Sequence, residues 1–203
     1  MFNTDWDFSR RCWTKLAAAS RKVDRRTLKT RAALLTVFRE LVLLHGYAAV
    51  AVGDIIRQAN IGHSTFYLHF SSKRDLLKHS LEGPCAGLAA CVDGDSAPER
   101  LSPLLKHFHE QRHINRVFFE DPLRSIWVGC LASAIERKLR GTPGHARSHR
   151  TLPVSLVAST IAEMQIAMII HWLKRSGSVS PERMAMAILT STRALLSSST
   201  RAP

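Results

Sequence analysis

The sequence predicts an all-α protein, with a small helical region in its first half and a larger helical region after it. Two observations carry this prediction. Apolar residues recur at helical spacing in one stretch after another, and no segment alternates apolar and polar residues as a half-buried strand does. The chain has 203 residues, 45% of them apolar, which is enough to form a hydrophobic core.

A long helix is expected over residues 31–45, ended by Gly46, because glycine readily adopts the left-handed conformation common just past a helix end. Its apolar positions follow one face of a helix: Leu34, Val37, Phe38, Leu41 and Val42. Two short helices follow, over residues 52–59 and 63–70, with a tight turn at residues 60–62 between them. A fourth should begin with Ser71 or Ser72 as its N-cap and stop at Gly83-Pro84.

The second half of the chain is also predicted to be helical. One is expected to begin at Pro98, and another to open with Asp121 as N-cap and Pro122 at the first helical position, running to about Leu139. Residues 141–151 are rich in Gly, Pro and His and predict a loop. Two last helices are expected over residues 153–174 and, after Ser180-Pro181, to about residue 197.

The charge favours a polyanionic partner. Twenty-nine Lys and Arg against 16 Asp and Glu give a net charge of +13, which suits nucleic acid or an anionic membrane surface. Residues 10–31 alone hold nine bases and one acid. A basic N-terminal arm over residues 1–27 either contacts DNA or is a solvated tail, and the sequence leaves both readings open.

Several classes of protein are disfavoured because the sequence lacks their characteristic motifs. The longest apolar run, near residues 164–173, is about half of a membrane span, and no apolar signal-peptide region opens the chain, so we expect a cytoplasmic protein. Four scattered cysteines form no CxxC pair, which argues against a disulfide framework or a zinc ribbon. No hydrolase elbow, P-loop or dinucleotide-binding motif is present, so we expect neither an enzyme nor a cofactor.

Two short helices joined by a tight turn, after a longer helix, describe a helix-turn-helix unit. Six residues are expected to lock it together: Val52, Ile55, Ile56, Ala59, Ile61 and Phe66. Six others are expected on the outer surface of its second helix: His63, Ser64, Thr65, Tyr67, Leu68 and His69. Hydroxyls and imidazoles can bond base edges or phosphates, and Leu68 or the Thr65 methyl can touch a thymine methyl. Lys73 would add a phosphate contact.

The segment GYAAVAVGDIIRQANIGHSTFYLHFSSKRDLL, residues 46–77, resembles the DNA-binding domain of the TetR (tetracycline-repressor-like) regulators. The resemblance covers about residues 28–82. It rests on Gly46-Tyr47, on the spacing from Asp54 to Ala59, and on the run from residue 65 to Lys73. It implies a DNA-binding domain over residues 28–82 and a helical effector-binding and dimerisation domain over residues 83–203.

The resemblance also implies roles for single residues. Thr65, Tyr67, His69 and Lys73 match positions that hold the phosphate backbone. Three positions vary with the operator and match base-reading residues: His63, Ser64 and Leu68. Arg31 is included among the expected DNA contacts. Two departures weaken the footprint of the first short helix: Ala51 where a capping Thr or Ser is usual, and Gly53 where a longer polar side chain is usual.

In the second half, aromatic, methionine and histidine residues are more often core than pocket, yet in this family the same helices enclose the effector cavity. The candidate pocket residues are Phe108, His109, Phe119, Trp127, Met164, Met168 and His171. The last two helices are apolar on more than one face, which predicts a dimer interface. Its candidate residues are Val157, Ile161, Ile169, Ile188, Leu189 and Leu195.

His109 and His113 have a metal-ligand spacing, but no third ligand completes a site, so we expect no metal. We expect a homodimeric transcriptional regulator, a repressor by preference, that binds a palindromic double-stranded DNA operator and responds to a small-molecule effector. The alternative is a nonspecific basic protein that binds nucleic acid or an anionic membrane surface without an effector.

Overall fold

The computed structural model describes residues 25–93, 97–112, 118–119, 121–141, 152–175 and 179–199. Within these residues the chain is helical and contains no strand, which confirms the expected all-α class. The residues divide into two compact units, one up to Gly83 and one from Pro84 onward. Each unit has its own core.

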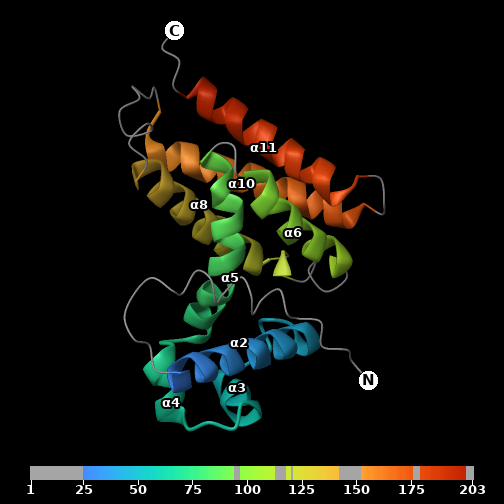
Figure 1. The fold of residues 1–203 in the computed structure, drawn as a ribbon. Helices are drawn as coiled ribbons and strands as arrows, with labels where there is room; N and C mark the ends of the chain where they lie inside the picture. The colour runs from blue at the N-terminus through green and yellow to red at the C-terminus, as the bar shows by residue number, and fades with distance from the viewer. Residues whose placement is uncertain are drawn as a thin grey trace. The chain divides into compact units, whose positions relative to one another are not determined.

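The first unit contains α2 (Arg25–His45), α3 (Val52–Gln58), α4 (His63–His69) and the first part of α5 (Lys73–Ala89) (Figure 1). Apolar side chains from all four helices fill its interior. The largest that are fully buried are Leu34, Phe38, Ile55, Phe66, Phe70, Leu76 and Leu77. The expected face of α2 is buried except at Val37, which is half-buried, and Gly46 ends the helix with φ at +77°, as predicted.

Two helix boundaries in this part of the chain differ from the prediction. Helix α2 begins by Arg25, so the bases from Arg25 to Arg31 lie on a helix; residues 1–24 of the expected arm lie outside the described residues. Helix α5 does not stop at Gly83-Pro84 but continues to Ala89 with Pro84 inside it. A proline can occupy a helix interior at the cost of one backbone hydrogen bond, and buried Cys85 and Leu88 help to hold the helix beyond it.

The second unit contains the end of α5, a 3-10 turn (Ala90–Val92), α6 (Ala97–Glu110), α8 (Leu123–Gly141), α10 (Val154–Lys174) and α11 (Pro181–Ser198). Helices α8 and α10 pack side by side, and α6 packs against α11 (Figure 1). Helix α11 begins after Ser180, as the sequence predicted, and Ser180 caps it, because its Oγ accepts the Arg183 N–H at 3.3 Å. The expected start of α8 is wrong by one residue, since the helix begins at Leu123 and Pro122 precedes it in a turn.

Helix α10 is the central apolar element of this unit. By length and composition alone it could cross a membrane. Nine of its residues are buried, including Ile161, Ile166 and Ile169. A helix that forms the core of a folded unit has this composition, and the apolar stretch therefore does not indicate a membrane span.

Candidate nucleic-acid interface

The helix-turn-helix unit is held together largely as the sequence predicted. Ile55, Ile56 and Phe66 are buried, whereas Val52, Ala59 and Ile61 are half-buried. In the turn, Asn60 has φ at +51° and its N–H donates to Arg57 O at 3.2 Å; the Ile61 N–H donates to Ile56 O at 3.2 Å. Asparagine tolerates this left-handed conformation better than most residues, so the tight turn is encoded locally.

Helix α4 presents an outward face of polar, aromatic and apolar side chains. His63, Ser64, Tyr67 and Leu68 are exposed, as predicted. Thr65 and His69 are half-buried and so contribute less surface than expected. On the opposite side Phe66 is fully buried, and it contacts the rings of Tyr67 and Phe70. A rigid hydrophobic backing therefore fixes the direction in which the outward residues point.

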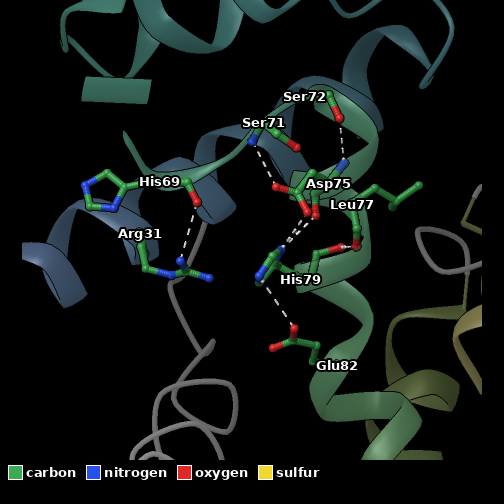
Figure 2. A network of polar contacts seen from close by, with 9 residues as sticks. Arg31, His69, Ser71, Ser72, Asp75, Leu77, His79 and Glu82 are labelled. Carbon is green, nitrogen blue, oxygen red and sulfur yellow. Dashed lines mark hydrogen bonds and ion pairs between the residues drawn. The ribbon is translucent and has the colours of Figure 1, made fainter. Parts of the chain in front are cut away.

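Arg31 braces the C-terminal end of α4 (Figure 2). Its guanidinium lies 4.8 Å from the centre of the Phe70 ring and makes a long hydrogen bond, 3.4 Å, to His69 O. Both contacts are within the chain. The sequence had suggested Arg31 only as a DNA contact, and it missed this bracing role because the partners lie almost forty residues away.

His69 has a neighbouring cation and a partly desolvated ring. Burial lowers its pKa from the usual value, and Arg31 lowers it further by charge repulsion. The imidazole is therefore predominantly neutral at neutral pH. As a DNA contact it would offer a neutral hydrogen-bonding ring rather than a positive charge.

Lys73 lies at the start of α5 and its ammonium is engaged within the chain. Nζ donates to Tyr47 O at 2.8 Å and to Val50 O at 2.7 Å, and it lies 4.3 Å from the centre of the Tyr47 ring. Burial lowers the pKa of the Lys73 ammonium. Two of its three N–H donors are thus used to hold the loop between α2 and α3. One N–H donor of Lys73 remains for the phosphate contact that the sequence predicted.

The N-terminus of α5 is capped by two side chains (Figure 2). Ser72 Oγ accepts the Asp75 N–H at 3.1 Å, and Asp75 Oδ2 accepts the Ser71 N–H at 2.9 Å, so Ser72 is the N-cap of the two candidates. The Ser71 N–H is the main cause of a lowered Asp75 pKa. His79 donates from Nδ1 to Asp75 O at 2.9 Å and packs its ring edge on Phe70. This network joins α5 to the end of α4.

The two departures from the family pattern behave differently. Ala51 is the N-cap of α3 and provides no side-chain cap, as expected. Asp54 Oδ2 accepts the Ala51 N–H at 3.0 Å, which preserves half of a capping box. The sequence signal for it, an acid three residues after the cap position, was available. Gly53 faces open space, so a longer side chain would fit there.

The candidate pocket residues of the second unit differ in their burial and in their contacts. Phe108, Phe119 and Trp127 are buried against one another, with the Phe119 and Trp127 rings stacked at 4.9 Å. His171 is exposed on α10, which does not support its expected place in an enclosed pocket. His109 stacks on Trp172 with ring centres 5.2 Å apart. Met164 and Met168 are half-buried on α10.

Five of the six predicted interface residues are core residues of the chain itself. Those with at most 4% exposure are Val157, Ile161, Ile169, Ile188 and Leu189. They are therefore not available to a second copy, and that prediction is wrong; Leu195 is half-buried. The sequence showed that these positions are apolar, but it did not show that neighbouring helices of the same chain cover them.

Two further predictions concern histidines and thiols. No group of three potential metal ligands occurs among the described residues; His113, the expected partner of His109, lies outside them. Cys85 and Cys91 are buried, and burial raises the pKa of the Cys91 thiol to about 12. A thiol that stays protonated is a poor nucleophile, so Cys91 acts as a small apolar core residue.

Residues 34–79 match the family described as bacterial regulatory proteins, tetR family. A curated relative from Bacillus subtilis (strain 168), the uncharacterized HTH-type transcriptional regulator YxbF, is 32% identical over 83 residues. That stretch is 40% of this chain and 22% of the relative. The chain thus spans about a fifth of the length of the curated relative it matches.

Solved structures are similar over most of the chain. A TetR transcriptional regulator from Streptococcus agalactiae 2603V is 26% identical with a TM-score of 0.54, covering 83% of this chain and 96% of that one. A TetR-family regulator from Streptomyces coelicolor A3 is 19% identical with a TM-score of 0.57, covering 88% and 99%. The second likeness concerns the fold alone. Both extend well beyond residues 34–79.

Proposed function

The chain belongs to the TetR family of bacterial regulators through residues 34–79, and on this premise we propose that it is a homodimeric repressor of transcription. It binds a palindromic DNA operator, and a small-molecule effector changes that affinity. The observation that carries the proposal is the exposed face of α4, which is backed by the buried apolar core of the first unit. A helix presented in this way fits the major groove of duplex DNA.

Charge supports DNA as the partner of the first unit. Residues 25–83 carry nine Lys and Arg against four Asp and Glu. This excess attracts phosphates without regard to sequence and gives a salt-dependent affinity. We assign the reading of bases to His63, Ser64 and Leu68, and the holding of the backbone to Thr65, Tyr67 and His69. The main role that we assign to Lys73 is to hold the loop between α2 and α3. A phosphate contact is its second role.

The dimer interface is reassigned to the outward faces of α10 and α11. Leu156 on α10 is 50% exposed and Met186 on α11 is 55% exposed. Half-buried Ala167 and Ile170 extend the apolar surface of α10 beyond its core-facing side. A helix that is apolar on two sides is stabilised by burial on both. In a homodimer bound to a palindromic operator, the two recognition helices would lie in successive major grooves, roughly 34–36 Å apart.

Two buried polar atoms of the second unit support an effector. Trp127 Nε1 and Gln165 Oε1 have no hydrogen-bond partner among the described residues. Gln165 uses its other end, donating from Nε2 to Thr192 Oγ1 at 3.0 Å. Buried polar groups without partners are rare, and a bound ligand or an ordered water would satisfy them. An effector would shift operator affinity only by its differential affinity for two states of the protein.

Selection of bound duplexes from a random DNA pool at near-physiological salt tests the proposal. We expect an enriched palindrome with half-sites about one helical turn apart. Tight but unselective, salt-sensitive binding would favour the alternative of a nonspecific basic protein. Flotation with anionic and neutral liposomes separates the membrane alternative, because a DNA-binding protein that reads sequence prefers its operator to anionic lipid.

A further inference from the structure

The outward face of α4 lacks the side chains that read purines by paired hydrogen bonds. Its sequence, HSTFYLH, contains no Arg, Lys, Asn or Gln. Arg and Lys are the common partners of guanine, and Asn and Gln are the bidentate partners of adenine. The discrimination available to α4 therefore comes from hydroxyls, imidazoles and apolar contact.

Leu68 is the most exposed large apolar side chain among the described residues, at 81%. Its position is well defined, because the neighbouring Phe66 and Phe70 are buried and Arg31 packs on the Phe70 ring. Leu68 lies one helical turn after Ser64 and Thr65, so the three share one side of the helix. An isobutyl group is thus presented to solvent from a rigid support, at the C-terminal end of the proposed DNA-reading face.

Polar and apolar groups are separated along this side of α4. A Cβ at Gly62 would lie 3.8 Å from Ser64 Oγ and 3.9 Å from Thr65 Oγ1, so both hydroxyls gather at the N-terminal end of the helix. Leu68 occupies the next turn, beside the exposed Tyr67. The hydroxyls at one end of α4 would form hydrogen bonds to base edges, and Leu68 at the other end would make apolar contact with a neighbouring base of the same half-site.

We infer that Leu68 is a specificity-determining residue that recognises the C5 methyl group of a pyrimidine in each operator half-site. This inference rests on the proposed sequence-specific DNA binding. The thymine methyl is the apolar group on a base edge in the major groove, and an apolar side chain is its partner. The same methyl group on 5-methylcytosine offers the same chemistry, so recognition depends on the methyl and not on the pairing edge.

Deoxyuridine substitution tests the inference directly, because it removes the methyl group and leaves base pairing and phosphates intact. Each thymine of the selected operator is replaced in turn, in both half-sites together, and the affinity of the full chain is measured. At one position we expect a loss of roughly fifteenfold, from about fourfold for each of the two methyl groups removed. The salt dependence should not change, because no phosphate contact is lost.

Leu68→Ala should bind the thymine and deoxyuridine duplexes equally well. Leu44→Ala is the matched control, since Leu44 is also a strongly exposed leucine (72%) but lies on α2; it should keep the wild-type preference. A cytosine at the sensitive position should gain affinity on 5-methylation in the wild type and not in Leu68→Ala. Leu68→Gln should move the preference at that position toward adenine.

Insensitivity of every thymine position, or sensitivity that persists in Leu68→Ala, would overturn the inference. Both results leave the proposed function standing, because the operator has already been selected. Failure of the selection to enrich any sequence would instead refute the proposed function and this inference with it. Circular dichroism of each variant shows whether its fold is retained, as expected for an exposed side chain.

Discussion

The ammonium of Lys73 donates a hydrogen bond of 2.7 Å to the carbonyl oxygen of Val50, and a second of 2.8 Å to that of Tyr47. Val50 closes the loop that leads into α3. The first residue of α5 therefore fixes the approach of the helix-turn-helix to the helix before it. A residue that the sequence suggested for DNA belongs, in the free protein, to the scaffold.

Replacing Lys73 should mainly destabilise the first unit. We expect Lys73→Met to lower the free energy of unfolding by about 1.5–3 kcal/mol, because hydrogen bonds from a charged donor to two carbonyls are lost. Operator affinity should fall with it, while the salt slope falls by well under the one unit of a full phosphate contact. Chemical denaturation and salt titrations measure both. Lys78→Met, which removes an exposed charge from the same helix, is the control. If the salt slope fell by a full unit in Lys73→Met and not in the control, Lys73 would be a phosphate ligand after all.

The lowered pKa of His69 gives the first unit a pH-dependent stability. Burial and the Arg31 charge disfavour the imidazolium in the folded state, so the unfolded chain binds more protons between the folded pKa and about 6.5. His69 therefore contributes stability that is present above about pH 6.5 and is lost as the pH falls through its folded pKa.

Denaturation midpoints between pH 7.5 and 5 should accordingly fall less steeply for His69→Gln than for the wild type. His63→Gln, the same substitution at an exposed histidine of the same helix, is the control. Parallel curves for His69→Gln and the wild type would show that neither burial nor the Arg31 charge lowers the pKa of His69.

Completing the cap of α3 should stabilise the protein. Ala51 already has extended N-cap dihedrals, φ −95° and ψ 157°, and Asp54 already accepts its N–H. Ala51→Ser adds the missing acceptor for an orphan N–H and should raise the free energy of unfolding by about 1 kcal/mol. The hydroxyl should also strengthen operator binding. The opposite change at a working cap, Ser72→Ala, should cost a similar amount. Thermal or urea unfolding checks both, and a stability that does not rise in Ala51→Ser would contradict the assignment.

A negative charge on the reassigned interface should separate the dimer. We expect Leu156→Glu combined with Met186→Glu to yield a folded monomer, because both side chains are exposed in the single chain and an interface would desolvate the added charges. Sedimentation velocity and circular dichroism measure size and fold. Leu44→Glu carries the same change at an exposed leucine of the other unit and should remain dimeric. A double variant that stays dimeric would place the interface elsewhere.

Pro84 lies inside α5 where the two units divide, between Gly83 and Pro84. It lacks the N–H that would donate to Ser80 O, which weakens the helix at that point. We expect Pro84→Ala to slow hydrogen exchange across residues 83–89 and to change operator affinity several-fold. Pro103→Ala, which alters a proline inside α6, is the control and should leave operator affinity unchanged. Unaltered affinity and effector response in Pro84→Ala would show that the weakened helix at Pro84 has no part in operator binding.

The local sequence pattern was sufficient to predict features that depend on a single helix. The apolar spacing predicted α2, α10 and α11, and Gly46 and Ser180 marked helix ends, because periodicity and capping depend on residues a few positions apart. The exposed residues of α4 followed from the same reasoning. The prediction that Pro84 ends the helix was wrong, because packing further along α5 offsets the one missing hydrogen bond.

The sequence by itself determined the helical class, the helix-turn-helix and its outward face. The tertiary structure decided which partner each side chain has. An apolar stripe is equally suited to the chain's own helices and to a second copy, so only packing showed that Ile161 and Ile188 are core. Likewise, a cation near DNA-binding residues is equally suited to a phosphate or to a carbonyl, and the position of Lys73 beside Val50 depends on how separate helices pack. Such pairings join residues distant in the chain, and no local pattern encodes them.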